Sequence, residues 1–167
     1  MAREDNTDKG TEELAERAWE ILGSSDSVVL FTVDNDDMFA RPMSPRRNED
    51  ERVIHFLTDT RSRKVKQIAA GHDRALVFCE HGNGYVSFRG TLTRSVDREK
   101  LRALWSPSDE AWWTSPDDSS LCLVTFHPAA AELWDKPSSM VAAALLIASK
   151  ITGDTPRLGD HAVIPVR

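Results

Sequence analysis

The pattern of apolar and polar positions along the chain predicts a protein built mainly from short strands. Val86, Phe88, Gly90 and Leu92 alternate with polar or aromatic neighbours, the period of two that is typical of a strand with one buried face. Residues 27–33 are apolar on both faces, as a fully buried strand would be. The same reading predicts further strands at residues 38–46, 52–58, 74–81, 85–96, 120–126 and 130–134.

Helices are predicted at the margins of these strands. Thr11 is suited to an N-cap, apolar residues then recur at helical spacing, and Gly23 ends the helix. Shorter helices are predicted at residues 62–70 and 97–105, and a helix rich in Ala and Leu at residues 138–151. No element is predicted from residue 152 onward, where turn residues are frequent.

The connections between the strands decide the predicted architecture. Most are tight turns, so antiparallel pairing is the default. Six or seven short strands with peripheral helices predict a small closed or partly closed barrel. The expected organisation is one domain: a disordered tail over residues 1–10, the barrel over residues 11–137, and a C-terminal extension over residues 138–167.

Composition and charge exclude several classes of protein. The chain has 27 acidic and 21 basic residues and a net charge of −6, which argues against a dedicated nucleic-acid binder. The longest apolar run, residues 140–148, is shorter than the roughly 20 residues that span a bilayer. The polar first ten residues resemble neither a signal peptide nor an anchor. We therefore expect a cytoplasmic protein without a membrane partner, in which Cys79 and Cys122 are reduced core residues.

Two kinds of active site receive no support from the residue spacing. The five histidines are scattered, and no third ligand accompanies the same-face pairs that they form with neighbouring residues. No metal site is therefore expected. No spacing of Ser, His and Asp indicates a hydrolase.

A basic cluster interrupts this acidic sequence. Arg61, Arg63, Lys64 and Lys66 fall within six positions, where a predicted strand ends and a helix begins. Helix N-termini attract anions, and Ser62 adds a hydroxyl, Arg63 a planar fork and Lys64 a compact charge. The pattern predicts a phosphate site whose side chains lie on the polar face of the helix. A solvated helix face is the alternative.

The features occur in a distinctive order. They are Arg41-Pro42-Met43-Ser44, a strand ending in Phe56-Leu57-Thr58, Ser62-Arg63-Lys64, Asn83-Gly84-Tyr85-Val86-Ser87-Phe88-Arg89-Gly90, Leu104-Trp105-Ser106-Pro107, Ala111-Trp112-Trp113 and Ala131-Glu132-Leu133-Trp134-Asp135. No single motif is specific, but the ordered set over about residues 12–136 is. It resembles the general stress protein 26 branch of the pyridoxamine 5'-phosphate oxidase-like, FMN-binding split-barrel superfamily.

The resemblance implies a fold, a cofactor and a partner. The fold is a six-stranded antiparallel split β-barrel that forms a homodimer, with a flavin in each of two clefts at the dimer interface. FMN is the implied cofactor, with FAD or the deazaflavin F420 as alternatives and haem as a further one. The implied cofactor-binding residues are Arg41, Pro42, Met43 and Ser44 beside the flavin ring, Phe56 and Thr58 on the next strand, Ser62, Arg63 and Lys64 at the phosphate, and Trp105 and Trp112 near the cleft.

The implied function is that of an oxidoreductase using NAD(P)H or a small organic substrate, with a link to stress. A non-catalytic flavin store or sensor and a dimeric structural module are the alternatives. Pyridoxamine phosphate oxidase activity itself is not expected. Trp134 is followed by Asp135-Lys136-Pro137-Ser138 rather than by the Arg-x-His segment of the true oxidases. The first hairpin has Asn35-Asp36-Asp37 in place of Asp-Gly, so a longer or bulged turn is expected.

Overall fold

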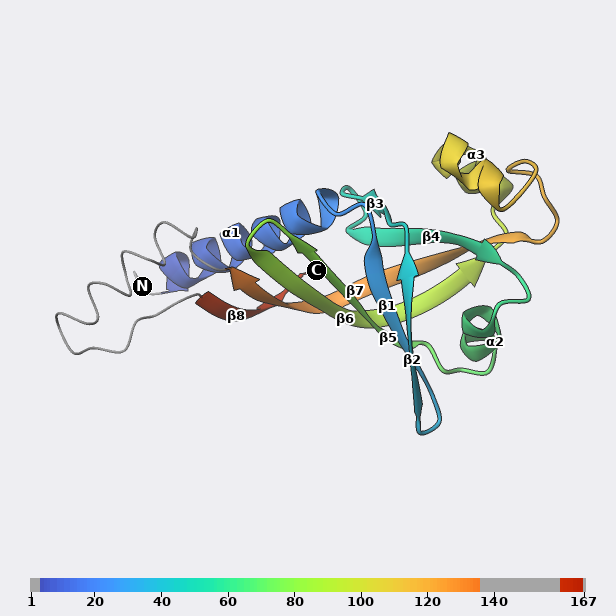
Figure 1. Cartoon of the computed structure of the whole chain (residues 1–167). Helices are drawn as coiled ribbons and strands as arrows, with labels where there is room; N and C mark the ends of the chain where they lie inside the picture. Colours follow the sequence, from blue (N-terminus) through green and yellow to red (C-terminus); the bar gives the residue numbers. More distant parts are fainter. Residues whose placement is uncertain (1–3, 136–159, 167) are drawn as a thin grey trace.

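The computed structural model describes residues 4–135 and 160–166 as one antiparallel sheet with helices at its margins (Figure 1). The strands are β1 (Val28–Asp34), β2 (Asp37–Met43), β3 (Arg46–Asn48), β4 (Val53–Asp59), β5 (Arg74–His81), β6 (Gly84–Ser95), β7 (Leu121–Asp135) and β8 (Asp160–Pro165). The helices are α1 (Glu4–Gly23), α2 (Arg63–Ala69), α3 (Arg98–Leu104) and the 3₁₀ turn η1 (Pro107–Ala111). Within these described segments, none of the helices has the length and apolarity that a bilayer crossing requires.

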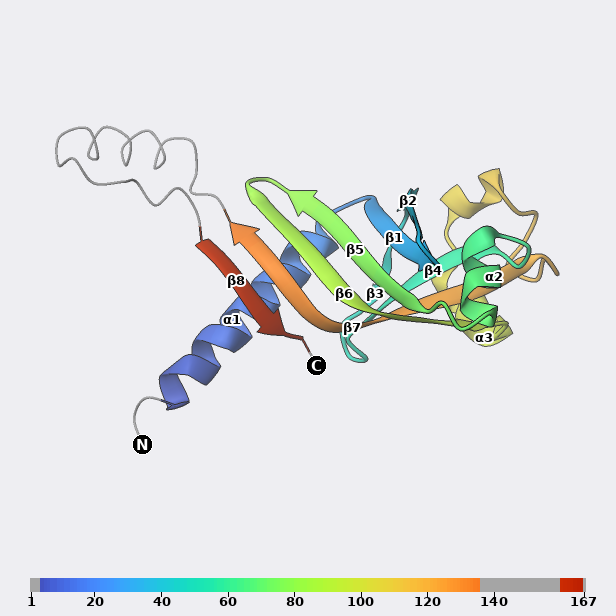
Figure 2. The same cartoon turned by 90° about the horizontal axis from the view of Figure 1, so that it is seen from below.

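The sheet is a barrel that does not close. Its strands follow the order β2-β1-β5-β6-β7-β4-β3, and every pair is antiparallel. The two end strands, β2 and β3, are consecutive in the chain and are joined through Ser44 and Pro45. The predicted mainly β fold, an antiparallel split β-barrel with peripheral helices, is therefore confirmed. β8 is an addition that pairs with the second half of β7, as Figure 2 shows.

The barrel interior forms the main hydrophobic core. Its largest fully buried side chains include Leu30, Phe56, Phe88 and Phe126. Helix α1 crosses the sheet beside β5, β6, β7 and β8 and buries its apolar stripe there (Figure 1). A second, smaller core lies under α3 and contains Leu101, Leu121 and Leu123.

The first helix is longer than the sequence predicts. It ends at Gly23 as expected, but it begins at Glu4 rather than after Thr11, within the segment for which a tail was expected. Periodicity could not find this extension because these residues have no apolar stripe. Extending an existing helix costs little, whereas starting one is unfavourable, so the packed segment from Leu14 onward can support the preceding turns.

Two predicted strands are one. Residues 120–126 and 130–134 belong to the single strand β7, which pairs with β6 along its whole length. The register shifts between Arg89 and Gly90, opposite Pro128, where the strand bends. A Cβ on Gly90 would lie 2.1 Å from the carbonyl oxygen of His127, so this close approach requires glycine.

The strand predicted at residues 38–46 is interrupted: β2 ends at Met43 and Arg46 begins β3. The remaining differences concern turns and the C-terminal region. Asp34 pairs with Asp37, so the first hairpin turn has two residues and is neither longer nor bulged. Asn35 takes the positive φ of 53° that such a turn requires, which asparagine tolerates well. β8 was not predicted, because its short segment becomes a strand only beside β7. The helix predicted at residues 138–151 lies outside the described residues.

Candidate functional site

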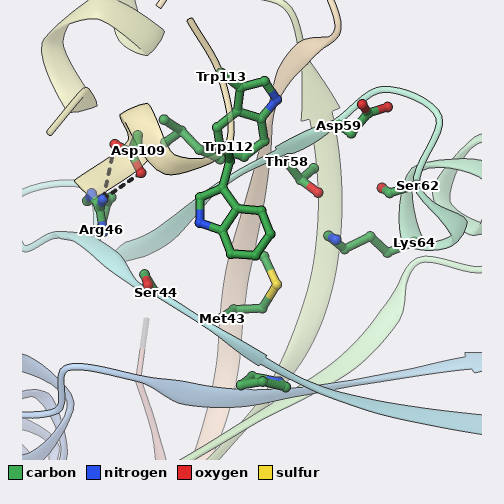
Figure 3. A pocket seen from close by; sticks show the side chains of 12 residues that line it. Met43, Ser44, Arg46, Thr58, Asp59, Ser62, Lys64, Asp109, Trp112 and Trp113 are labelled. Carbon is green, nitrogen blue, oxygen red and sulfur yellow. Dashed lines mark hydrogen bonds and ion pairs between the residues drawn. The ribbon is translucent and has the colours of Figure 1, made fainter. Parts of the chain in front are cut away.

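A cleft of about 410 Å³ opens where the barrel is split (Figure 3). One wall is the chain that runs from β2 into β3, and the other is the end of β4 with the start of α2. Asp109 of η1 and the two tryptophans that follow η1 complete the lining. The lining residues are Pro42, Met43, Ser44, Arg46, Leu57, Thr58, Asp59, Ser62, Lys64, Asp109, Trp112 and Trp113.

Seven of the eleven predicted cofactor-binding residues line this cleft. They are Pro42, Met43, Ser44, Thr58, Ser62, Lys64 and Trp112. Arg41, Phe56, Arg63 and Trp105 do not line it. The sheet brings the lining segments together. The strand order places β2 and β3 at the open seam, and the end of β4 lies beside it because β3 pairs only with Val53–His55. Their contacts with a cofactor stay a prediction.

Ser62 and Lys64 are donors without acceptors at one end of the cleft. Ser62 is the residue before α2, yet its side chain makes no capping bond, and its Oγ is buried without a hydrogen-bond partner. Lys64 is 9% exposed, and no described residue forms a salt bridge with it. The expectation that this lysine lies on the polar face of the helix is therefore wrong. Burial lowers the pKa of Lys64, and the charge of Arg41 lowers it further.

Arg41 belongs to the same group of cations. Its Nη2 donates to Thr32 Oγ1 at 2.9 Å, while its Nη1 is buried and has no partner. Burial lowers the pKa of Arg41, and the charge of Arg63 adds to this effect. The resemblance implies a place beside a flavin ring for this arginine. In the structure, Arg63 and Lys64 of the predicted phosphate site are charges that interact with it.

The other members of the basic cluster point elsewhere. The Arg63 guanidinium lies over the ring of Phe39, 4.5 Å from its centroid, and is exposed. Arg61 donates to both carboxylate oxygens of Asp59, at 3.1 and 2.9 Å, and these bonds hold the pKa of Asp59 at about 2. Lys66 is exposed. Of the four clustered cations, only Lys64 lines the cleft, because successive helix residues face different directions.

Two tryptophans line the cleft. Trp112 is 79% exposed, and in Figure 3 its ring lies above Met43, between Arg46 and Lys64, with Trp113 above it. Trp105 packs against the second core. Phe56 shares a strand face with Thr58. It comes two residues earlier on β4 and is fully buried in the main core. The cleft thus combines polar and cationic side chains with a flat aromatic surface.

The sequence matches the family model described as "Pyridoxamine 5'-phosphate oxidase like" over residues 13–157. The chain belongs to the pyridoxamine 5'-phosphate oxidase-like family. The predicted resemblance is therefore confirmed. Among curated proteins, none matches the chain.

Solved structures support the same assignment. A protein assigned as general stress protein 26 from a Jannaschia species is 27% identical and has a TM-score of 0.76, covering 92% of this chain and 99% of that chain. A general stress family protein of Xanthomonas campestris is 28% identical with a TM-score of 0.65, over 77% of this chain and 90% of that chain. The general stress FMN/FAD binding protein of Xanthomonas citri is 27% identical with a TM-score of 0.67, over 77% and 93%.

One wall of the cleft in this family member is fixed by an ion pair that the sequence analysis missed. Arg46 Nη2 donates to both carboxylate oxygens of Asp109, at 3.1 and 3.2 Å, and to Ser106 Oγ at 2.9 Å. The Ser106 backbone N–H in turn donates to Asp109 Oδ2 at 2.8 Å. These bonds tie η1, and with it Trp112, to β3.

Five lining residues were absent from the sequence-based prediction. They are Arg46, Leu57, Asp59, Asp109 and Trp113. The spacing of Ser106 and Asp109 is a capping-box pattern that could have predicted the short helical turn. No local signal could have linked Asp109 to Arg46, because the two lie 63 positions apart. In the part of the chain that the structure describes, no three His, Cys, Asp or Glu side chains converge as metal ligands would.

Proposed function

We propose that this chain binds FMN in the split-barrel cleft and acts as an oxidoreductase. The observation that carries the proposal is the pairing of donors that lack acceptors, Ser62 Oγ and the Lys64 ammonium, with an aromatic wall in one cleft. A buried donor or charge without a partner is costly, so its presence in a cleft favours a ligand that supplies the partner. Membership of the family supports the same ligand class.

The residues present fit a flavin nucleotide. Ser62 and Lys64 would hold the phosphate, and Arg41 would add positive charge near it. Met43 and Trp112 offer flat or adaptable apolar surface for a ring system. The similar protein of Xanthomonas citri is named an FMN/FAD binding protein, which favours a flavin over haem or the deazaflavin F420.

When bound, a flavin would supply hydride chemistry that amino-acid side chains do not provide. The work of the chain would then be to bind and to shield. Lys64 would neutralise the phosphate charge, and Trp112 would cover the cleft and exclude water. The proposed electron donor is NAD(P)H or a small organic substrate. A role in stress is proposed from the names of the similar proteins.

The purified protein is expected to show the absorption spectrum of oxidised flavin, or to acquire it when FMN is added and excess ligand is removed. NADH or NADPH added without oxygen should then bleach the band, which would support catalysis. A flavin band that resists both reductants and a panel of small organic donors would contradict the oxidoreductase and favour storage or sensing. Failure to retain any flavin, or the spectrum of haem or a deazaflavin, would contradict the FMN site.

We also propose that the chain is a cytoplasmic homodimer. The outer face of β1, β2 and β5 carries an apolar hollow of about 610 Å³, lined by Phe31, Val33, Met38, Leu76 and Phe78. Met38 is 70% exposed, and large exposed apolar patches mark interaction surfaces. A second copy of the chain is the proposed occupant, since it presents the same apolar face. The free, buried thiols of Cys79 and Cys122 suit a reducing compartment.

Met38→Lys is expected to convert the dimer to a monomer, because a symmetric contact would bring two new like charges together in an apolar environment. Sedimentation velocity at micromolar concentration measures this. Val96→Lys is the matched control, since Val96 is also exposed but does not line the apolar hollow. A wild-type monomer, or equal effects of both substitutions, would contradict the proposed interface.

A further inference from the structure

A buried polar relay lies behind the basic end of the cleft. Arg41 Nη2 on β2 donates to Thr32 Oγ1 on β1 at 2.9 Å. The same Thr32 hydroxyl lies 2.9 Å from Gln67 Oε1 on α2, to which it donates. Thr32 and Gln67 are only 1% and 3% exposed. The two strands of the first hairpin and the distant helix α2 therefore meet at one threonine hydroxyl.

The relay fixes the direction of every hydrogen bond in it. A threonine hydroxyl has one hydrogen, and here it is directed to Gln67 because the other bond accepts from a guanidinium that has only donors. The acceptor end of the Gln67 amide is thereby occupied. Its Nε2 is left buried without a partner, and so is Arg41 Nη1. Each of these two donors shares a carbon atom with a group that contacts Thr32 Oγ1.

Two buried donors without acceptors in one small cluster require an explanation. Each such group costs free energy unless an acceptor reaches it. The surrounding charges indicate which acceptor would suit: Arg63 and Lys64 are the charged groups that act on Arg41, and both are cations. Ser62 Oγ, at the start of α2, is also a buried donor without a partner. An anionic oxygen satisfies all of these groups, whereas an apolar ligand satisfies none.

We propose that Thr32 and Gln67 are positioning residues for the phosphate group of the ligand: the relay orients the Arg41 guanidinium and the Gln67 amide so that both present a free N–H to it. The inference rests on the proposed flavin nucleotide site and deepens it. Thr32 and Gln67 lie outside the Ser62-Arg63-Lys64 motif, so the motif alone does not indicate their role. Thr32 acts through Arg41 and Gln67 and does not itself touch the ligand.

Thr32→Val tests the relay because it replaces a hydroxyl by a methyl group of similar size. The expected result is an approximately tenfold loss of FMN affinity, the loss of one well-oriented bond to a charged group, with riboflavin affinity unchanged. Gln67→Met, which keeps the length of the side chain and removes the amide, should give the same selective loss. Thr32→Ser, which keeps the hydroxyl, should restore the preference for FMN. Equilibrium titration of each variant with both ligands measures the ratio.

Thr125→Val is the matched control. The Thr125 hydroxyl, like that of Thr32, is hydrogen-bonded to a side chain, here His55 Nδ1 at 2.9 Å, but Thr125 is on β7 and does not line the cleft. It should keep the wild-type preference for FMN. Equal losses of FMN and riboflavin in Thr32→Val and Gln67→Met, or an unchanged preference in both, would overturn the proposal and leave the relay a packing feature.

A second measurement tests the relay without any flavin. Inorganic phosphate should raise the melting temperature of the wild type and of Thr125→Val, and should raise that of Thr32→Val and Gln67→Met less. If the wild type binds neither FMN nor riboflavin, the proposed function fails. The rise in melting temperature with phosphate then tests the proposed role of Thr32 and Gln67 by itself. If the wild type prefers FMN but the variants behave like the wild type in both assays, the relay fails and the proposed function stands. If Thr32→Val does not fold, Gln67→Met and Thr32→Ser decide the result.

Discussion

Replacing Lys64 with methionine is expected to weaken FMN binding about tenfold to a hundredfold and to leave riboflavin binding almost unchanged. A hydrogen bond to a charged group contributes about 1.5–3 kcal/mol, and only FMN has the phosphate that accepts it. Methionine keeps the unbranched apolar stem, which matters because Lys64 is buried. Titration of both ligands by fluorescence measures the two dissociation constants.

The same substitution should not destabilise the protein without ligand. Burial and the charge of Arg41 both lower the pKa of Lys64, so the folded state without ligand disfavours its charge. Removing a charge that has no described partner relieves this penalty, and the free energy of unfolding should stay the same or rise. Residues of binding sites often make the protein without ligand less stable than it could be. Urea denaturation without flavin checks this part of the prediction.

Lys66→Met is the control for Lys64→Met. Lys66 is also on α2, but it is exposed and does not line the cleft. It should change neither the FMN affinity nor the unfolding free energy by more than about 0.5 kcal/mol, as for ordinary surface sites. A loss at Lys66 that equals or exceeds the loss at Lys64 would show that the phosphate lies elsewhere. So would a parallel loss of riboflavin in Lys64→Met.

Phe56→Ala is expected to reduce the free energy of unfolding by about 3–5 kcal/mol. Phe56 is fully buried in the main core, so its removal leaves a cavity among well-packed neighbours. Such a loss is a large fraction of the total stability of a domain. Trp112→Ala should change the unfolding free energy by less than about 0.5 kcal/mol, because its side chain is largely exposed. Urea denaturation of the two variants without flavin gives the comparison.

For ligand binding, the substitution at Trp112 should have the larger effect and a substitution at Phe56 the smaller one. Trp112→Ala should weaken FMN and riboflavin together, because the two ligands share the ring that an aromatic wall would contact. Phe56→Leu, a milder core change that is expected to stay folded, should leave both affinities near the wild-type values. Similar stability losses in Phe56→Ala and Trp112→Ala would contradict the core placement of Phe56. Weaker flavin binding in Phe56→Leu, with no change in Trp112→Ala, would reverse the proposed roles of the two residues.

The sequence by itself determined most of the strands, their antiparallel sense and the position of two residues that line the cleft, Ser62 and Lys64. Alternation along β6 and the apolar run of β1 are local patterns, and tight turns explain the pairing of β1 with β2 and of β5 with β6. The motif at Ser62 and Lys64 is equally local, since one helical turn places both beside the same space. The ordered set of motifs determined the family, because order along the chain is a property of the sequence.

Only the tertiary structure decided which of the candidate residues face the cleft. Phe56 and Thr58 share a strand face, and depth within the barrel alone separates a core residue from a lining one. Arg63 and Lys64 are neighbours in sequence, but helix geometry turns one onto Phe39 and the other into the cleft. The pattern around position 64 predicted a polar helix face for this lysine, whereas the packing of α2 against the barrel buries it.

The contacts that organise the site are long-range, and this is why the sequence could not reveal them. Thr32 and Gln67 are 35 positions apart, and Arg46 and Asp109 are 63 positions apart. Nothing in the local sequence of a threonine or an aspartate indicates which distant side chain will complete its hydrogen bonds. Local periodicity determines which face of each element is buried, whereas the curvature of the whole sheet determines which elements meet at the seam.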